Sequence, residues 1–147
     1  MNKRRTIAAL ALAGIFVALY LTLHRLGFFG GGGLVCAVGS CDLVNASSWA
    51  TFLWVPVAAW GLGYYVVTFA IAMVSLQERF AHSMHISRLL LFLGATGFLF
   101  SAWLTYLELF VIRAICQWCV VSALLATGIF VSSLLDYREL RQLPASD

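Results

Sequence analysis

The chain has 147 residues, of which 63% are hydrophobic and only 10% are charged. A soluble domain is roughly half apolar and about a quarter charged, so this composition excludes an ordinary soluble globule, a disordered chain and a nucleic-acid-binding protein. The formal net charge is only +3, and the length allows about four membrane spans joined by short loops.

Four apolar stretches are long enough to cross a bilayer, which takes roughly 20 residues of helix. They lie at about residues 6–23, 55–76, 89–112 and 116–135. Each is apolar around its whole circumference, as in a membrane span and unlike an amphipathic surface helix. The first stretch could instead be a signal peptide. Its Ala-Leu-Ala sequence at 9–11 lies inside the apolar run, however, and a cleavage site follows such a run, so we expect a retained span.

The predicted fold is therefore an all-α membrane protein, a bundle of four transmembrane helices forming a single domain over residues 1–147. Seven of the nine Lys and Arg residues fall in the N-terminal segment (three), the 77–88 connection (two) and the C-terminal tail (two). Four spans place these three segments on one side, and the positive-inside rule predicts that both termini are cytoplasmic. Residues 24–54 and 113–116 are then expected outside the cytoplasm.

The four cysteines form two close pairs, a C-x4-C at Cys36 and Cys41 and a C-x-x-C at Cys116 and Cys119. Both pairs are predicted on the outer side, where an oxidising compartment permits disulfide chemistry. Cys116 stands at the predicted start of the fourth helix. There the unpaired backbone N–H groups and the helix dipole favour a thiolate, which is the species that attacks disulfides.

A run of four glycines at residues 30–33 precedes the C-x4-C pair and predicts a flexible tether. A mobile pair and a pair at the membrane edge together suggest an electron relay. In this hypothesis the loop pair takes electrons from an outside partner and passes them to the helix pair. A lipid-soluble acceptor such as a quinone would finally receive them within the bundle.

Two other interpretations of the cysteines remain open. Four cysteines could hold zinc, although the C-x4-C spacing exceeds the usual structural pattern and His24 is the one histidine near either pair. The pairs could also be two static structural disulfides, as is common in outer loops. The C-x-x-C at a helix start favours the redox interpretation over both.

The segment between the first two spans predicts a short helix lying on the membrane, which Asp42 could cap. Trp49 and Trp54 suit the membrane interface, and Pro56 suits the first turn of the second span. Glu108 lies near the end of the third span. We expect it to face the headgroup region, although a buried carboxyl could pass protons to a quinone.

These features resemble the vitamin K epoxide reductase family in its bacterial form. The shared pattern is four spans, a cysteine pair in the loop before the second span, and a C-x-x-C at the start of the fourth. The likeness is most detailed from Cys36 to Tyr64, where the sequence reads C-x4-C-D-x-V. Further residues in this stretch also match family positions, namely Ser47, Trp49, Pro56 and Gly61.

The resemblance implies a membrane thiol:quinone oxidoreductase that generates disulfides in the bacterial inner membrane, with its cysteines on the periplasmic side. It implies that Cys36 exchanges with a thioredoxin-like (DsbA-type) partner, that Cys41 exchanges with Cys116, and that Cys119 faces the quinone. Many bacterial members carry a fused thioredoxin-like domain, and because this sequence stops at Asp147 we expect a separate partner.

The expected acceptor is ubiquinone or menaquinone. The residues expected to contact it are Ser47, Trp49, Val57, Trp60 and Ala123. Ala123 stands where vertebrate members have a tyrosine, which argues against vitamin K epoxide chemistry. Two alternatives are a DsbB-type thiol oxidase, whose C-x-x-C lies in the first outer loop instead, and a non-enzymatic membrane protein with structural or metal-binding cysteines.

Overall fold

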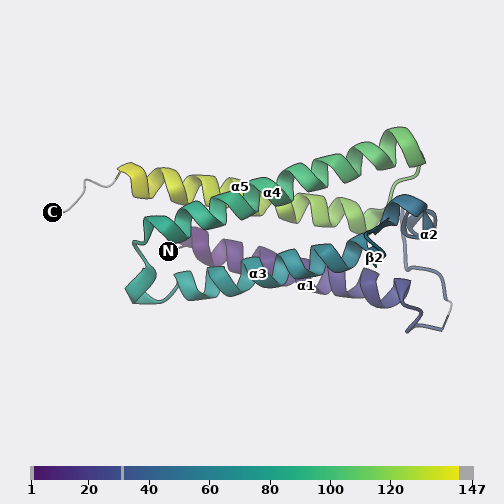
Figure 1. Cartoon of the computed structure of the whole chain (residues 1–147), viewed down its shortest axis with the longest axis horizontal. Coiled ribbons are helices and arrows are strands. Elements are labelled where there is room, and N and C mark those ends of the chain that lie inside the picture. The colour runs from purple at the N-terminus through teal and green to yellow at the C-terminus, as the bar shows by residue number, and fades with distance from the viewer. Residues whose placement is uncertain (1, 31, 143–147) are drawn as a thin grey trace.

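Four long helices form an antiparallel bundle in a computed structural model that describes residues 2–30 and 32–142 (Figure 1). The helices are α1 Asn2–Arg25, α3 Val57–Ser75, α4 Met84–Tyr106 and α5 Gln117–Gln142. The chain of α4 continues through one π-helical segment, η3 Leu107–Ile112. The prediction of an all-α, four-helix membrane bundle is confirmed. The first and last helices extend beyond their apolar runs because the charged flanking residues stay helical.

The bundle has two distinct ends. We call the end that holds the start of α1 and the end of α5 the terminal end, and the opposite one the cysteine end (Figure 1). The 3-10 turn η2 Glu78–Phe80 joins α3 to α4 at the terminal end. The cysteine end holds the link between α1 and α3, which contains α2 Cys41–Ala46, the 3-10 turn η1 Ser48–Ala50, and the strands β1 Thr51–Phe52 and β2 Val55–Pro56.

The short helix expected between the first two spans is α2, but Asp42 does not cap it. Because α2 begins at Cys41, Asp42 lies in its first turn, and its carboxylate accepts the backbone N–H of Leu34 at 2.8 Å. The sequence also gave no sign of the β1–β2 hairpin. Its two-residue turn, Leu53 and Trp54, has positive φ at both positions (51° and 68°), where Asn and Gly are usual.

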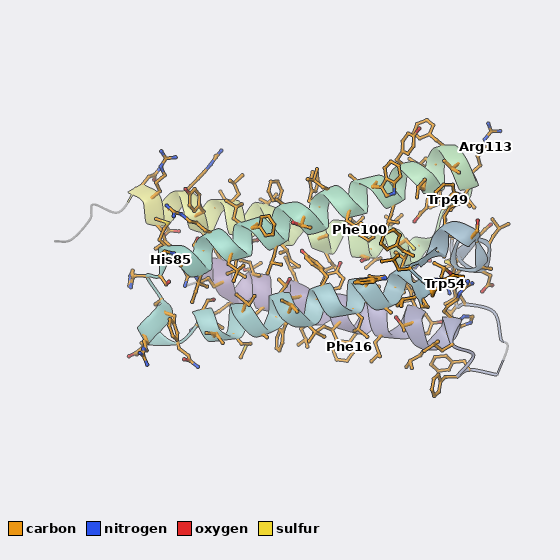
Figure 2. All side chains as sticks on the ribbon, in the orientation of Figure 1. Phe16, Trp49, Trp54, His85, Phe100 and Arg113 are labelled. Atoms are coloured by element: carbon orange, nitrogen blue, oxygen red, sulfur yellow. A yellow bond between two sulfur atoms is a disulfide. The ribbon has the colours of Figure 1, made fainter. Side chains whose placement is uncertain are left out.

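Large apolar side chains project outward along the length of the bundle (Figure 2). Phe16 in the middle of α1 is 65% exposed, and Trp54 at the cysteine end is 99% exposed. Such a surface would be unfavourable in water and is favourable in lipid. All four helices are long and apolar enough to cross a membrane, which fits a multi-pass membrane protein.

A buried ionic network joins the four helices at the terminal end. Arg4 of α1 donates from Nε to both carboxylate oxygens of Asp136 on α5, at 3.1 and 3.2 Å. Its Nη1 donates to the carbonyls of Ser75, at the end of α3, and Phe80, in η2. The Ser87 hydroxyl of α4 completes the network by donating to Asp136 at 2.8 Å. Arg4 was expected only to flank the first span, but it is just 1% exposed.

The four helices do not pack equally against one another. Tight packing joins α1 to α3, α1 to α5 and α4 to α5, whereas α3 and α4 contact each other far less. The close approach of α1 to α3 depends on Gly14, because a Cβ there would stand 2.3 Å from the Tyr65 ring. The weak contact between α3 and α4 leaves room for a cavity inside the bundle.

We predict that Arg4→Ala lowers the free energy of unfolding by about 3–5 kcal/mol, because it leaves the Asp136 carboxylate buried and unpaired. Replacing both partners by apolar residues, as in Arg4→Met/Asp136→Leu, should recover much of that loss. The measurement is denaturant unfolding of the purified protein in detergent. As a control, Lys3→Ala removes the neighbouring exposed pair with Glu139 and should change little. Equal losses for Lys3→Ala and Arg4→Ala would contradict the prediction.

Candidate redox site

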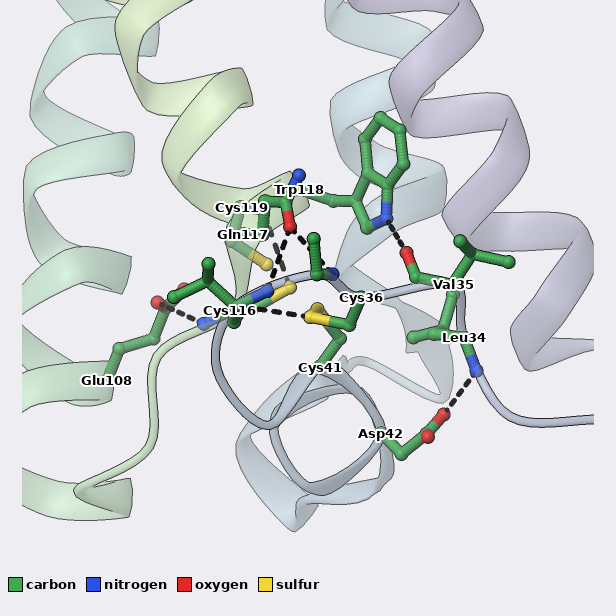
Figure 3. The surroundings of a disulfide bond; sticks show 12 residues. Leu34, Val35, Cys36, Cys41, Asp42, Glu108, Cys116, Gln117, Trp118 and Cys119 are labelled. Carbon is green, nitrogen blue, oxygen red and sulfur yellow. Dashed lines mark hydrogen bonds between the residues drawn. A yellow bond between two sulfur atoms is a disulfide. The ribbon is translucent and has the colours of Figure 1, made fainter.

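The loop that carries the first cysteine pair lies across the start of α5 (Figure 3). Gly39 pairs with Cys116 as an antiparallel bridge, and the Ser40 N–H donates to the Ile115 carbonyl at 2.8 Å. Gly39 has φ +93°, and a Cβ there would stand 2.2 Å from the Ile115 carbonyl oxygen. A glycine is therefore needed for this backbone contact.

Two side chains of the first turn of α5 hold the same loop. The Gln117 Oε1 accepts the backbone N–H groups of Ala37 and Val38, at 3.0 and 3.2 Å. The Trp118 indole N–H donates to the Val35 carbonyl at 2.8 Å. The structure thus shows the segment after the glycine run docked on α5, and the flexibility of the glycine run itself stays a prediction. Gly31, within the predicted tether, lies outside the described residues.

The four cysteines lie near this docking point and differ in how far each is exposed. Cys36 and Cys41 form a disulfide, and Cys116 and Cys119 are free thiols. Cys41 is 1% exposed and Cys116 is 0% exposed, and both belong to one packed apolar cluster. Cys36 is partly exposed on the outside of this cluster, and Cys119 is partly exposed where it lines the cavity.

Cys116 acts as the N-cap of α5. Its carbonyl accepts the N–H of Val120 at 3.0 Å, and its sulfur accepts the N–H of Cys119 at 3.4 Å. A side-chain acceptor at this position satisfies one of the unpaired donors of the first turn. Hydrogen bonding from Cys119 lowers the pKa of the Cys116 thiol, against the opposing effect of burial. Cys116 is therefore the thiol of this pair that is prepared to react as a thiolate.

A cavity of about 340 Å³ lies inside the bundle next to Cys119. Its walls come from α1, α2, α3, α4 and α5, and they are mainly apolar. All the residues expected to contact a quinone line this cavity, namely Ser47, Trp49, Val57, Trp60 and Ala123. Figure 2 shows Trp49 at the cysteine end and Phe100, another lining residue, on α4.

The polar groups of the cavity are few and differ in how they are paired. The Ser47 hydroxyl donates to the Val44 carbonyl at 2.8 Å, as a loop serine would. The Tyr65 hydroxyl lies 2.8 Å from both the carbonyl and the hydroxyl oxygen of Ser122. The Tyr64 hydroxyl is buried and has no hydrogen-bond partner among the described residues. This hydroxyl is enclosed against α4, because a Cβ at Gly97 would stand 2.3 Å from it.

Glu108 differs from its expected place among the headgroups. Its side chain is in the wall of the cavity, the residue is 6% exposed, and one carboxylate oxygen accepts the Cys116 N–H at 3.3 Å. The short distance of Glu108 from the expected end of the third span predicted the headgroup position. The π-helical segment η3, which has no sequence signature here, carries it into the interior.

A model of the vitamin K epoxide reductase family matches residues 5–134 of the chain. The match covers most of the sequence, including all four cysteines, and the chain therefore belongs to this family. Members are membrane oxidoreductases that generate disulfides in quinone-linked reactions and typically work with thioredoxin-like proteins. The sequence prediction of this family is confirmed.

We predict that Cys119→Ala raises the pKa of Cys116, because the side-chain hydrogen bond that favours the thiolate is lost. At a pH between the Cys116 pKa of the parent protein and that of the variant, the variant should hold less Cys116 thiolate. A parent with Cys36→Ser and Cys41→Ser isolates this pair, and ultraviolet absorbance of the thiolate follows its titration. Cys119→Ser, which keeps a donor, should shift the pKa less than Cys119→Ala. A lower pKa in Cys119→Ala would contradict the prediction.

Proposed function

We propose that this protein oxidises a separate periplasmic thioredoxin-like protein and reduces a membrane quinone, with electrons passing from Cys36 and Cys41 to Cys116 and Cys119. The observation that carries the proposal is the burial of Cys41 and Cys116 in one packed cluster. It lies between a partly exposed sulfur, Cys36, and a sulfur that lines an apolar cavity, Cys119. An electron relay from a water-soluble partner to a lipid-soluble acceptor needs the sulfurs in this order: an exposed one, two buried ones, and one at the cavity.

The first exchange takes place at the partly exposed Cys36. A partner thiolate attacks the Cys36 sulfur, so that a mixed disulfide forms and the Cys41 thiolate leaves. The second thiol of the partner then displaces Cys36, and the partner departs with a disulfide. Cys41, at 1% exposed, is closed to a protein partner but open to the buried Cys116. The loop pair now holds two electrons.

The second exchange takes place inside the packed cluster. The Cys41 thiolate attacks Cys116 in a Cys116–Cys119 disulfide and releases the Cys119 thiolate. Cys36 then displaces Cys116 from Cys41, which restores the loop disulfide and leaves two thiols on α5. The structure has this pairing, with a Cys36–Cys41 bond and two free thiols. The Cys116–Cys119 bond then re-forms as two electrons and two protons reduce quinone to quinol.

The cavity suits a quinone headgroup in size and polarity. Ligand pockets of this class are mainly apolar and carry a few placed polar groups. Val57, Trp60 and Ala123 provide apolar and aromatic surface for a ring, and Trp49 closes the cavity near α2. Tyr64 also lines the cavity, and a small shift of its ring away from Gly97 would bring its unpaired hydroxyl to a quinone carbonyl as a donor. Ubiquinone and menaquinone both present such a ring and carbonyl.

The proposed orientation places the cysteine end in the periplasm and the terminal end in the cytoplasm of a bacterial inner membrane. Seven of the nine basic residues support it, because they gather in the three segments at the terminal end. At the cysteine end stand Arg25, which donates to the Asn45 carbonyl, and Arg113, which Figure 2 shows beyond the end of α4.

We predict that Cys36→Ser and Cys119→Ser each accumulate a Cys41–Cys116 disulfide, because each change removes the thiol that would resolve it. Non-reducing digestion and mass spectrometry of the purified protein show the linkage. A reduced thioredoxin-like protein with a short-chain ubiquinone should support turnover by the wild type and by neither variant. Cys41→Ser serves as the control that cannot form the link. Finding Cys36 joined to Cys119, without the Cys41–Cys116 species, would contradict this order of transfer.

We predict that Tyr64→Phe raises the KM for quinone about fivefold, since a neutral hydrogen bond contributes about 1 kcal/mol. It should leave the free energy of unfolding unchanged, because the hydroxyl has no partner within the described chain. Tyr65→Phe is the matched control. It should destabilise the protein, because its hydroxyl bonds Ser122. Steady-state kinetics and unfolding in detergent separate the two effects, and an unchanged KM in Tyr64→Phe would remove this tyrosine from the quinone site.

A further inference from the structure

Glu108 is a buried carboxyl with no basic partner among the described residues. The two ion pairs of the described chain, Lys3–Glu139 and Arg4–Asp136, both lie at the terminal end. Glu108 is 6% exposed and sits at the opposite end, in the wall of an apolar cavity. Burying a carboxyl without a cation is costly, and in a membrane protein such a group marks a functional site by default.

The local backbone places this carboxyl beside the C-x-x-C segment. Leu107–Ile112 is π-helical, and such segments frequently occur at functional sites because the wider turn redirects side chains. The segment ends at Arg113, whose φ is +55°, and the Ala114 N–H returns to the Glu108 carbonyl at 3.1 Å. The chain is thereby folded back, so that Cys116 donates its N–H to the Glu108 carboxylate (Figure 3).

Glu108 and the second thiol of the pair line the same cavity. Cys119 is partly exposed there, and the Glu108 side chain stands in the same wall. The other titratable groups on the cavity wall are Tyr64 and Tyr65. The Tyr65 hydroxyl is committed to Ser122, and neither tyrosine has a hydrogen bond to a cysteine. Glu108 is thus the titratable cavity group that is hydrogen-bonded to the backbone of the C-x-x-C pair and also lines the cavity.

We infer that Glu108 is a catalytic residue that carries a proton from the Cys119 thiol to a quinone oxygen. The inference rests on the proposed quinone reduction. As the Cys116–Cys119 bond forms, two electrons pass to the quinone, the carboxylate accepts the Cys119 proton, and the resulting acid delivers it to one quinone oxygen. The proton of Cys116, or one from the outside when Cys116 is a thiolate, goes to the other oxygen. Glu108 returns to its carboxylate form, and the products are one disulfide and one quinol.

The test is Glu108→Gln in the full-length protein in detergent. The amide can still accept the Cys116 N–H but cannot carry a proton. The protein is reduced, freed of reductant and mixed with a short-chain ubiquinone, and the quinone absorbance is followed through a single turnover. We expect the rate to fall about a hundredfold, within the usual contribution of a positioned acid–base group. Glu139→Gln, the same change at an exposed carboxyl of the terminal end, should react as the wild type does.

Two further measurements separate proton transfer from a structural role. Glu108→Gln combined with Cys36→Ser should still accumulate the Cys41–Cys116 disulfide in full yield, because thiol exchange does not need the carboxyl. The slow single turnover of Glu108→Ala should be restored in part by added formate, a small carboxylic acid that fits the space left by the side chain.

The outcomes distinguish this inference from the proposal beneath it. No quinone reduction by the wild type would overturn both. Normal wild-type turnover together with an undiminished rate in Glu108→Gln would overturn the role of Glu108 alone. A slow Glu108→Gln that also loses the Cys41–Cys116 disulfide, with no effect of formate on Glu108→Ala, would assign Glu108 to positioning Cys116 and overturn proton transfer.

Discussion

The contact of Gly39 with the backbone before α5 is the constraint on which the rest of the site depends. A Cβ at this position would stand 2.2 Å from the Ile115 carbonyl oxygen, so the two chain segments can meet only at a glycine. That contact holds Cys41 in one buried cluster with Cys116, although 74 residues separate them in the sequence. Thiol exchange needs one sulfur to approach another directly, and a docked backbone provides this approach without a long search by a loose loop.

The burial of each cysteine decides which molecules can reach its sulfur. A protein partner reaches a sulfur only where the surface exposes it, which here favours Cys36 over the 1% exposed Cys41. A lipid-soluble acceptor reaches a sulfur only from the cavity, which favours Cys119 over the fully buried Cys116. The two interior sulfurs can therefore exchange with each other and with their own neighbours, and with little else. In the proposed relay, the same packing would keep an outside thiol from reducing Cys116 and Cys119 directly.

Hydropathy and charge predict the spans well because each span is set by local composition. Hydropathy and charge predict that Arg4 and Asp136 lie near the ends of the first and fourth spans. They do not predict that the two side chains form a buried ion pair, because this pairing depends on how α1 packs against α5. The docking of Gly39 and the orientation of Glu108 also depend on tertiary packing, so hydropathy and charge do not predict them. A glycine between two close cysteines and a carboxyl eight residues before a C-x-x-C are the signals that the sequence does hold. Neither reveals its partner until the helices are packed.

The two ends of the bundle divide the work of stability and chemistry. At the terminal end the Arg4 network joins all four helices through buried hydrogen bonds. Irregular backbone gathers at the other end, where Leu53, Trp54 and Arg113 have positive φ and η3 is π-helical. Such conformations cost free energy and persist only where the surrounding structure holds them. The bundle is fixed at the terminal end, and the weak contact between α3 and α4 leaves a cavity that is lined by the parts of both helices nearer the cysteine end. The loop, the hairpin and Glu108 complete its wall there.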